Sequence, residues 1–270
     1  MTNLLKIEWL KIKAYPAFWW VLGVTALAYP GINYAMFSFY NRILNDPKTV
    51  GPAIKTMIGN PFSYNEVWHT VGYFSSWFIL FPAIIVIMLI TNEYTFRTNR
   101  QNVIDGWTRK QFLTAKFLDV CIISVLITIL YFLVCLLIRT NEGALGGEGT
   151  NKMYFIGYFL LLTFSQLSLA FFIGFLVRKS FIALSLYLFL SMILEPLLTG
   201  ILERLNLKIG QFFPFEISDR MIPPPAFFGR FSPEKYQQAM DSTFTHCIYT
   251  VIFTLLVWLF CFRLNAKRDL

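Results

Sequence analysis

Histidine and cysteine, the side chains that most often act as catalysts or metal ligands, are few in this sequence and widely spaced. The two histidines, His69 and His246, lie far apart, and neither stands in an HExxH pattern or beside a pair of acids. The four cysteines lie in apolar runs, without the CxxC or Cys/His spacing of a metal site. We therefore expect no catalytic residue and no metal site in this chain, and we interpret both histidines as structural or interfacial.

The sequence also lacks a nucleotide-binding motif. A Walker A motif has the form Gly-x4-Gly-Lys-Ser/Thr, because its backbone N–H groups must wrap the phosphates. The glycine-rich run Gly143–Gly149 is followed by Thr150, Asn151 and Lys152, and it follows no predicted strand. We therefore expect that this chain does not hydrolyse ATP.

The composition is that of an integral membrane protein. Hydrophobic residues make up 56% of the 270 residues and charged residues only 14%, whereas a soluble domain carries about 25% charged residues. The net charge of +8 could indicate a nucleic-acid partner. However, the basic residues gather in loops between apolar runs, so we expect a lipid bilayer and no nucleic acid as the partner.

The apolar runs predict an all-α polytopic protein with six transmembrane helices in a single domain, 1–270. Each run is long enough for a bilayer core of about 30 Å at 1.5 Å per residue. The predicted spans are residues 17–39, 73–90, 117–138, 153–177, 181–202 and 244–262.

Segments outside these spans also have predicted roles. Residues 1–15 are expected to form an interfacial helix. An alternative, a signal peptide cleaved at Ala26-Leu27-Ala28, is disfavoured because the apolar run continues to Phe39. The prolines at 30, 82 and 196 are candidate helix kinks.

The polar segment 91–116 determines the predicted orientation. Positive charge is denser in this segment, in the loop after residue 177 and at the two termini than in the other loops. Because positive loops stay in the cytoplasm, we expect both termini and the 91–116 loop to be cytoplasmic, and residues 203–243 to form an outer loop. The protein is expected in the cytoplasmic (inner) membrane as a multi-pass protein.

Local signals predict the shape of the 91–116 loop. Residues 95–104 contain no proline or glycine and are compatible with a short helix, and Asp105-Gly106 is a turn signal. Thr108 and Gln111 have the spacing of a capping box, which starts the helix leading into the third span. A short helix held between two spans is suited to press into a groove on a soluble partner.

This pattern resembles the permease subunits of type-2 ATP-binding-cassette exporters, including bacitracin-resistance-like permeases. In that family the second span ends in Glu-Tyr/Phe and is followed by Gly-Thr-x-Arg, a turn, Ser/Thr-Arg and a lysine entering the third span. The matching residues here are Glu93-Tyr94, Arg97-Thr98-Asn99-Arg100, Gly106, Thr108-Arg109 and Lys116. The sequence departs from the family pattern at Arg97, where glycine is usual, and at Gly106, where proline is common.

The resemblance implies that the 91–116 loop couples to a separate ATPase subunit, which binds ATP and Mg²⁺. The coupling residues it implies are Glu93, Tyr94, Arg97, Thr98, Arg100, Asp105, Gly106, Arg109 and Lys116. It also implies that the chain forms half of a translocation path and pairs with a second copy or with a sister permease. The alternative for the arginines is contact with lipid phosphates.

A second set of candidate residues lies near the outer loop. Glu195 and Pro196 lie near the outer part of the fifth span, and Phe213 and Phe215 follow in the outer loop, so all four could line a path or a gate. The alternative is that Glu195 lies at the wet end of its helix without a role in transport. Two further functions stay open, namely an ion-coupled secondary transporter and a membrane-embedded enzyme such as a protease or a lipid transferase.

Overall fold

The computed structural model describes residues 9, 13, 15–45, 60–98, 106–141, 152–225 and 232–267. All regular structure in these ranges is helical, as predicted. The elements are α2 (Pro16–Asn45), α4 (Val67–Ser76), α5 (Leu80–Thr95), α7 (Arg109–Asn141), α8 (Phe155–Val177), α9 (Ser180–Leu188), the π-helix η1 (Phe189–Leu194), α10 (Glu195–Arg204), the 3₁₀-helix η2 (Lys208–Phe212), α11 (Pro214–Asp219) and α13 (Pro233–Lys267).

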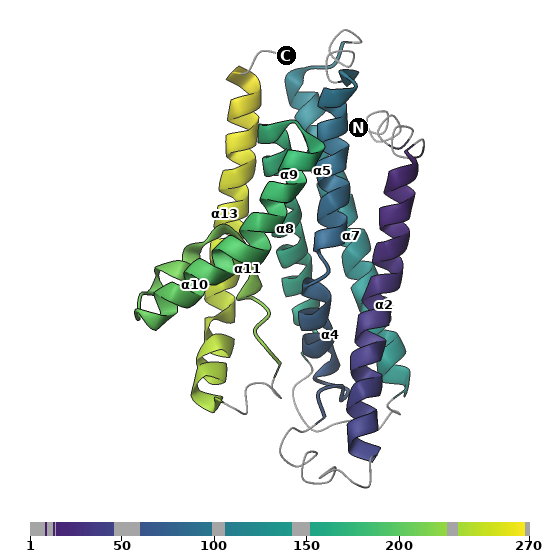
Figure 1. The fold of residues 1–270 in the computed structure, drawn as a ribbon, viewed down its shortest axis with the longest axis vertical. Helices are drawn as coiled ribbons and strands as arrows, with labels where there is room; N and C mark the ends of the chain where they lie inside the picture. Colours follow the sequence, from purple (N-terminus) through teal and green to yellow (C-terminus); the bar gives the residue numbers. More distant parts are fainter. Residues whose placement is uncertain are drawn as a thin grey trace.

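Helix α8 forms the centre of the bundle. It packs against α4, α5, α7, α9, α11 and α13, and 67% of its most apolar stretch is buried. A helix that is apolar on all sides is expected to be surrounded by other helices. Figure 1 shows α2, α5, α7 and α13 running along the long axis around it.

Hydropathy and length identify four helical segments that can cross a membrane, at residues 109–139, 155–177, 180–204 and 233–267. The α4–α5 pair makes a fifth if its two halves are taken as one span bent by 47°. Helix α2 is 30 residues long but is not among the helices apolar enough to qualify. The fold class is therefore confirmed at the level of a helical protein with four to five candidate spans in the described ranges.

The second predicted span begins earlier than expected. The second span was predicted to start at residue 73, but residues 67–72 are already helical and belong to α4, where Trp68 and His69 are fully buried. His69 Nε2 lies 2.7 Å from the carbonyl oxygen of Pro223 and its ring stacks on Phe155 at 4.2 Å. These polar side chains lowered the hydropathy of a segment that is buried against protein rather than lipid.

Two of the three predicted kinks coincide with irregular backbone. The α4–α5 break at residues 77–79 lies just before Pro82, and η1 lies just before Pro196. Proline removes one N–H group and its ring collides with the carbonyl four residues earlier, so the preceding turn must bend or widen.

The predicted outer loop 203–243 is largely helical. After α10 the chain folds back through η2 and α11, and α13 then begins at Pro233. Residues 233–243 of this predicted loop are the first part of α13, which continues without a break into the last predicted span. In Figure 1, α10 leaves the bundle obliquely. Helix α13 runs from the lower end of the bundle in this view to the upper end, where the C-terminus is marked.

Candidate functional site

A buried ion pair joins the two ends of the predicted coupling loop. Glu93 lies in the last turn of α5 and Lys116 in the second turn of α7. Lys116 Nζ is 2.9 Å from Glu93 Oε1 and 3.6 Å from Asp119 Oδ2, with the Lys116 and Glu93 side chains only 2% and 4% exposed. The Thr98 hydroxyl donates to the second oxygen of Glu93. Removing one charge from such a pair leaves the other uncompensated, so the pair holds the two helix ends together.

The loop is also tied to the C-terminal helix. Thr108 and Gln111 form the predicted capping box, with the Thr108 amide 2.8 Å from Gln111 Oε1 and the Gln111 amide 3.2 Å from Thr108 Oγ1. In the same turn Asn265 Nδ2 donates to the carbonyl of Arg109 at 2.8 Å, and Arg109 Nη1 donates to the carbonyl of Ala266 at 3.4 Å. These hydrogen bonds connect the start of α7 to the end of α13.

A third connection runs from α5 to the α8–α9 junction. The guanidinium of Arg178 lies 4.8 Å from the centre of the Tyr94 ring, and the hydroxyls of Thr91 and Ser180 are 2.6 Å apart. The predicted site residues Glu93, Tyr94 and Lys116 thus face the bundle and hold its helices in place.

Other residues of the loop face outward. Phe96 is 67% exposed, and Arg97 is exposed with a φ of 55°. Gly106 has a φ of 92° and supplies the predicted turn. The left-handed φ at Arg97 suits glycine, the residue that the family pattern has there. The remaining predicted coupling residues, Arg100 and Asp105, lie outside the described residues.

Glu195 has a local structural role on the far side of the fold. Its Oε2 accepts hydrogen bonds from the amides of Phe215 at 2.9 Å and Glu216 at 3.2 Å. A carboxylate placed on the first amides of a helix stabilises that helix end. Glu195 therefore caps α11 from α10, while Phe213 directly precedes α11 and Pro196 stands in the first turn of α10. The structure thus brings these four predicted residues together around α11.

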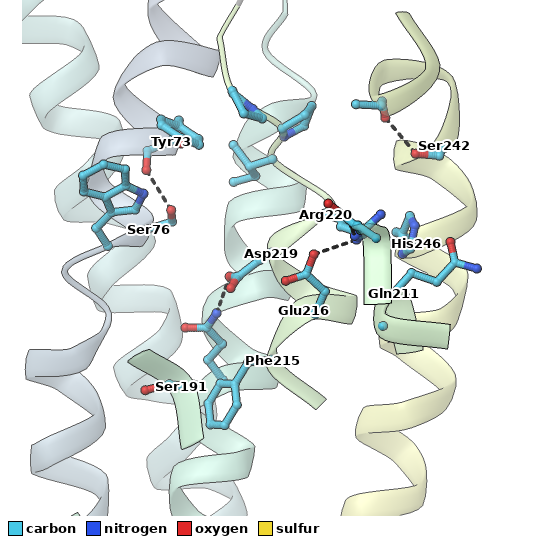
Figure 2. A pocket seen from close by; sticks show the side chains of 18 of the residues that line it. Tyr73, Ser76, Ser191, Gln211, Phe215, Glu216, Asp219, Arg220, Ser242 and His246 are labelled. Carbon is cyan, nitrogen blue, oxygen red and sulfur yellow. Dashed lines mark hydrogen bonds and ion pairs between the residues drawn. The ribbon is translucent and has the colours of Figure 1, made fainter. Parts of the chain in front are cut away.

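A cavity of about 1030 Å³ opens beside α11, between α4, α8, η1, η2 and α13. Figure 2 shows Asp219 in its wall, pointing toward a side-chain amide, which belongs to Gln166 of α8. Gln166 Nε2 donates to Asp219 Oδ1 at 2.6 Å. Arg220 contacts Glu216 at 2.7 Å and Glu203 at 2.6 Å. The Asp219 side chain is exposed to the cavity. Desolvation by the surrounding protein, together with the charge of Glu216, raises the pKa of its carboxyl to about 7.

Four residues with evident roles were not among the predicted site residues: Asp119, Gln166, Asp219 and Asn265. The i, i+3 spacing of Lys116 and Asp119 at the start of an apolar run was a signal for the first. Gln166, a polar residue inside a span, was a signal for the second. For Asp219 and Asn265 the sequence holds no local signal, because their partners lie on other helices.

These features define a multi-pass helical membrane protein whose helix ends are connected through a polar loop. The family model described as "ABC-2 family transporter protein" matches residues 4–194, which is more than half of the chain. The chain therefore belongs to the ABC-2 transporter family and is a membrane component of an ABC transporter. Family membership implies partnership with an ABC ATPase subunit. Residues 195–270 lie outside the match, and no curated protein matches the chain.

Proposed function

We propose that this chain is the transmembrane subunit of an ATP-driven exporter, that it forms half of a translocation path and that its 91–116 loop receives the motion of a separate ATPase. The observation that carries the proposal is the buried Glu93–Lys116 pair, which locks the ends of α5 and α7 together. With Asn265 bound to Arg109, a push on the loop is transmitted to α13 as well. ATP and Mg²⁺ are bound by the partner, which closes on ATP. The narrower bacitracin-resistance-like group remains part of this proposal.

The proposed topology has six spans with both termini in the cytoplasm of the cell and the protein in the inner membrane. Helix α2 serves as the first span, because its 30 residues extend about 45 Å at 1.5 Å per residue. Its Trp20 and Leu27 side chains are 77% and 76% exposed, as suits a lipid-facing surface. In Figure 1 the start of α2 and the end of α13 lie at the end of the bundle where α5 ends and α7 begins. This arrangement supports an even number of crossings.

The proposed assembly contains two permease subunits and two ATPase subunits. One chain forms half of the path, so a second copy or a sister permease completes it. The exposed residues Phe96 and Arg97 face the ATPase, while Glu93 and Lys116 act inside the permease.

Co-purification tests this proposal. The tagged full chain is isolated from membranes of its own host, and vanadate-sensitive ATP hydrolysis is measured in the eluate. We expect this ATPase activity to co-purify with the wild-type chain. Arg97→Glu is expected to reduce it at least about fivefold, because reversing a central interface charge costs more than removing a rim contact.

Lys179→Glu is the matched control, since Lys179 is also exposed and lies in the α8–α9 connection at the same end of the bundle. It should retain most of the activity. The proposal is wrong if no such ATPase co-purifies with the wild-type chain. It is also wrong if Arg97→Glu and Lys179→Glu lose the co-purified ATPase activity equally.

A further inference from the structure

The cavity beside α11 is bordered by the two irregular places in the spans. Trp77 lies in the break between α4 and α5, and Ser191 and Met192 lie in η1. A π-helical turn is less stable than an α-helical one and is found mostly at functional sites. Both irregular segments contribute residues to the wall of the same cavity. Its volume of about 1030 Å³ is slightly above the range of small-molecule sites, about 300–1,000 Å³.

Charges in the cavity are distributed unevenly. Arg220 is paired with both Glu203 and Glu216, so these three residues leave one net negative charge. The cavity wall also holds two lysines, Lys208 and Lys235, which are exposed. Among the described residues no basic side chain pairs with Asp219.

Asp219 is held in a defined position by a neutral partner. Its Oδ1 accepts the amide of Gln166, which is 7% exposed and anchored in the central helix α8. Figure 2 shows the carboxylate turned toward the side of the cavity where Tyr73 and Ser76 lie. A carboxylate fixed by one neutral donor keeps acceptor capacity for a positively charged ligand.

The walls around Asp219 are aromatic and apolar. Tyr73, Trp77, Tyr187 and Phe215 line the cavity. Aromatic faces attract organic cations through their quadrupole, and most strongly where water is excluded. Trp77 and Met192 are also 59% and 60% exposed at the outer surface, so the cavity continues into an apolar surface.

We propose that this cavity binds an organic cation with an apolar body, with the charged group at Asp219 and the body along Trp77 and Met192. The proposal deepens the function given above, on which it rests for the idea that the bound molecule is transported. The binding itself requires neither ATP nor the ATPase subunit.

A pair of probes with the same shape and opposite charge tests the wild-type chain. The purified full chain is placed in lipid nanodiscs, and binding of tetraphenylphosphonium and of tetraphenylborate is measured by equilibrium dialysis against empty nanodiscs. Saturable binding of the cation is expected, with the anion at least about tenfold weaker, because its charge is repelled by Asp219. Equal binding of the two ions, or no saturable binding of the cation, would overturn the proposal.

Substitutions at two acids of the same cavity locate the site. Asp219→Asn should weaken cation binding about tenfold or more, and Asp219→Glu should restore part of the loss, because the charge is the essential feature. Glu203→Gln removes the same charge from an acid already paired with Arg220 and should change binding less than about threefold. An equal loss in Asp219→Asn and Glu203→Gln would contradict the assignment to Asp219. If Asp219→Asn does not fold, the comparison of the two probes on the wild-type chain still decides.

A lipid ammonium headgroup offers the same chemistry as a soluble cation. The dialysis is therefore repeated in phosphatidylglycerol nanodiscs with and without phosphatidylethanolamine. If phosphatidylethanolamine competes with tetraphenylphosphonium, the cation site is supported and its ligand is a lipid headgroup. If it does not compete, the cation site is supported and its ligand is a free cation. Because no ATP is present, failure of this experiment leaves the co-purification result untouched, and failure of co-purification leaves cation binding untouched.

Discussion

Lys116 is the residue on which the largest stability effect is expected. It lies between two acids, Glu93 and Asp119, and is 2% exposed. Lys116→Gln leaves both acids without their cation and should destabilise the protein by about 3 kcal/mol. Glu93→Gln should cost less, because Asp119 still pairs with the lysine. Thermal unfolding followed by tryptophan fluorescence in detergent measures both.

Lys110→Gln is the control for this comparison, since Lys110 is exposed in the first turn of the same helix. It should change stability by less than about 0.5 kcal/mol. Equal melting temperatures for Lys116→Gln and Lys110→Gln would show that the buried pair does not hold the loop.

Asp219 should make stability depend on pH. Burial raises its pKa from 3.8 to about 7, and the carboxylates of Glu216 and Glu195 act in the same direction, while the Gln166 amide opposes them. The folded state therefore binds a proton that the unfolded state has already lost between about pH 4 and pH 7. Stability contributed by this group is full below pH 4 and is lost as the pH rises to about 7.

Melting temperatures at pH 5 and pH 8 measure this effect. The decrease from pH 5 to pH 8 should be smaller in Asp219→Asn than in the wild type, whereas Glu203→Gln should follow the wild type. A pH dependence that is the same in all three proteins would rule out a raised pKa at Asp219.

At the residue scale the sequence could predict what depends on neighbours in the chain. The capping box of Thr108 and Gln111 is complete within four residues, and it forms as predicted. The partner of Glu93 could not be found in this way, because it is set by how α5 packs against α7. For the same reason Glu195 was predicted as a gate residue without its contact to the α11 amides, which requires the chain to fold back.

At the scale of elements, Glu195 should control the stability of α11. This helix has only six residues, so it depends on contacts from outside. Glu195→Ala removes the acceptor for two amides and should increase hydrogen exchange at Phe215 and Glu216 roughly tenfold, as expected for a lost cap of about 1–2 kcal/mol.

Glu195→Gln tests the same contact with its geometry preserved, because the amide oxygen can still accept. It should increase exchange less than the alanine substitution does. Exchange in η2, at Lys208–Phe212, serves as the internal reference. If α11 exchanges at the wild-type rate in Glu195→Ala, the cap does not stabilise it.

Hydropathy predicted the long apolar helices and missed the start of α4, a buried segment that carries polar side chains. The runs that became α7 and α13 were found because segments that face lipid must be apolar along their whole length. Helix α8 was found because it is also apolar throughout, although it is covered mainly by other helices. Helix α4 was partly assigned to a loop because His69 and Thr70 are polar, although both are fully buried, and His69 contacts the carbonyl of Pro223. Kinks were easier to predict, since Pro82 and Pro196 act on their own preceding turn.

At the scale of the whole molecule, the orientation can be tested by labelling. In a variant without the four native cysteines, Lys235→Cys places a thiol near the start of α13 and Lys110→Cys places one at the start of α7. Both positions are exposed. A membrane-impermeant maleimide should label Lys235→Cys in intact cells and Lys110→Cys only after permeabilisation.

Labelling of both positions in intact cells would contradict the six-span topology, and labelling of Lys110→Cys alone would reverse the orientation. The variant that lacks the four native cysteines and carries no introduced cysteine provides the background signal. The proposal that both termini lie in the cytoplasm depends on the density of positive charge in the loops. The apolar spans carry no signal for orientation.

The family could be inferred from sequence because its pattern lies in one continuous segment, from Glu93 to Lys116. The cavity could not, because its wall combines side chains from α4, α8, η1, α11 and α13 that are distant in the chain. Much of it, including Asp219, also lies in residues 195–270, beyond the region that the family model matches.

The bond between Asn265 and Arg109 has a practical consequence for anyone who labels this protein. Asn265 and Ala266 contact Arg109 at the start of α7. A fluorescent reporter fused after Lys267 would therefore lie close to the start of α7, next to the surface where the ATPase is proposed to dock. A long glycine–serine linker would give such a reporter room to move aside.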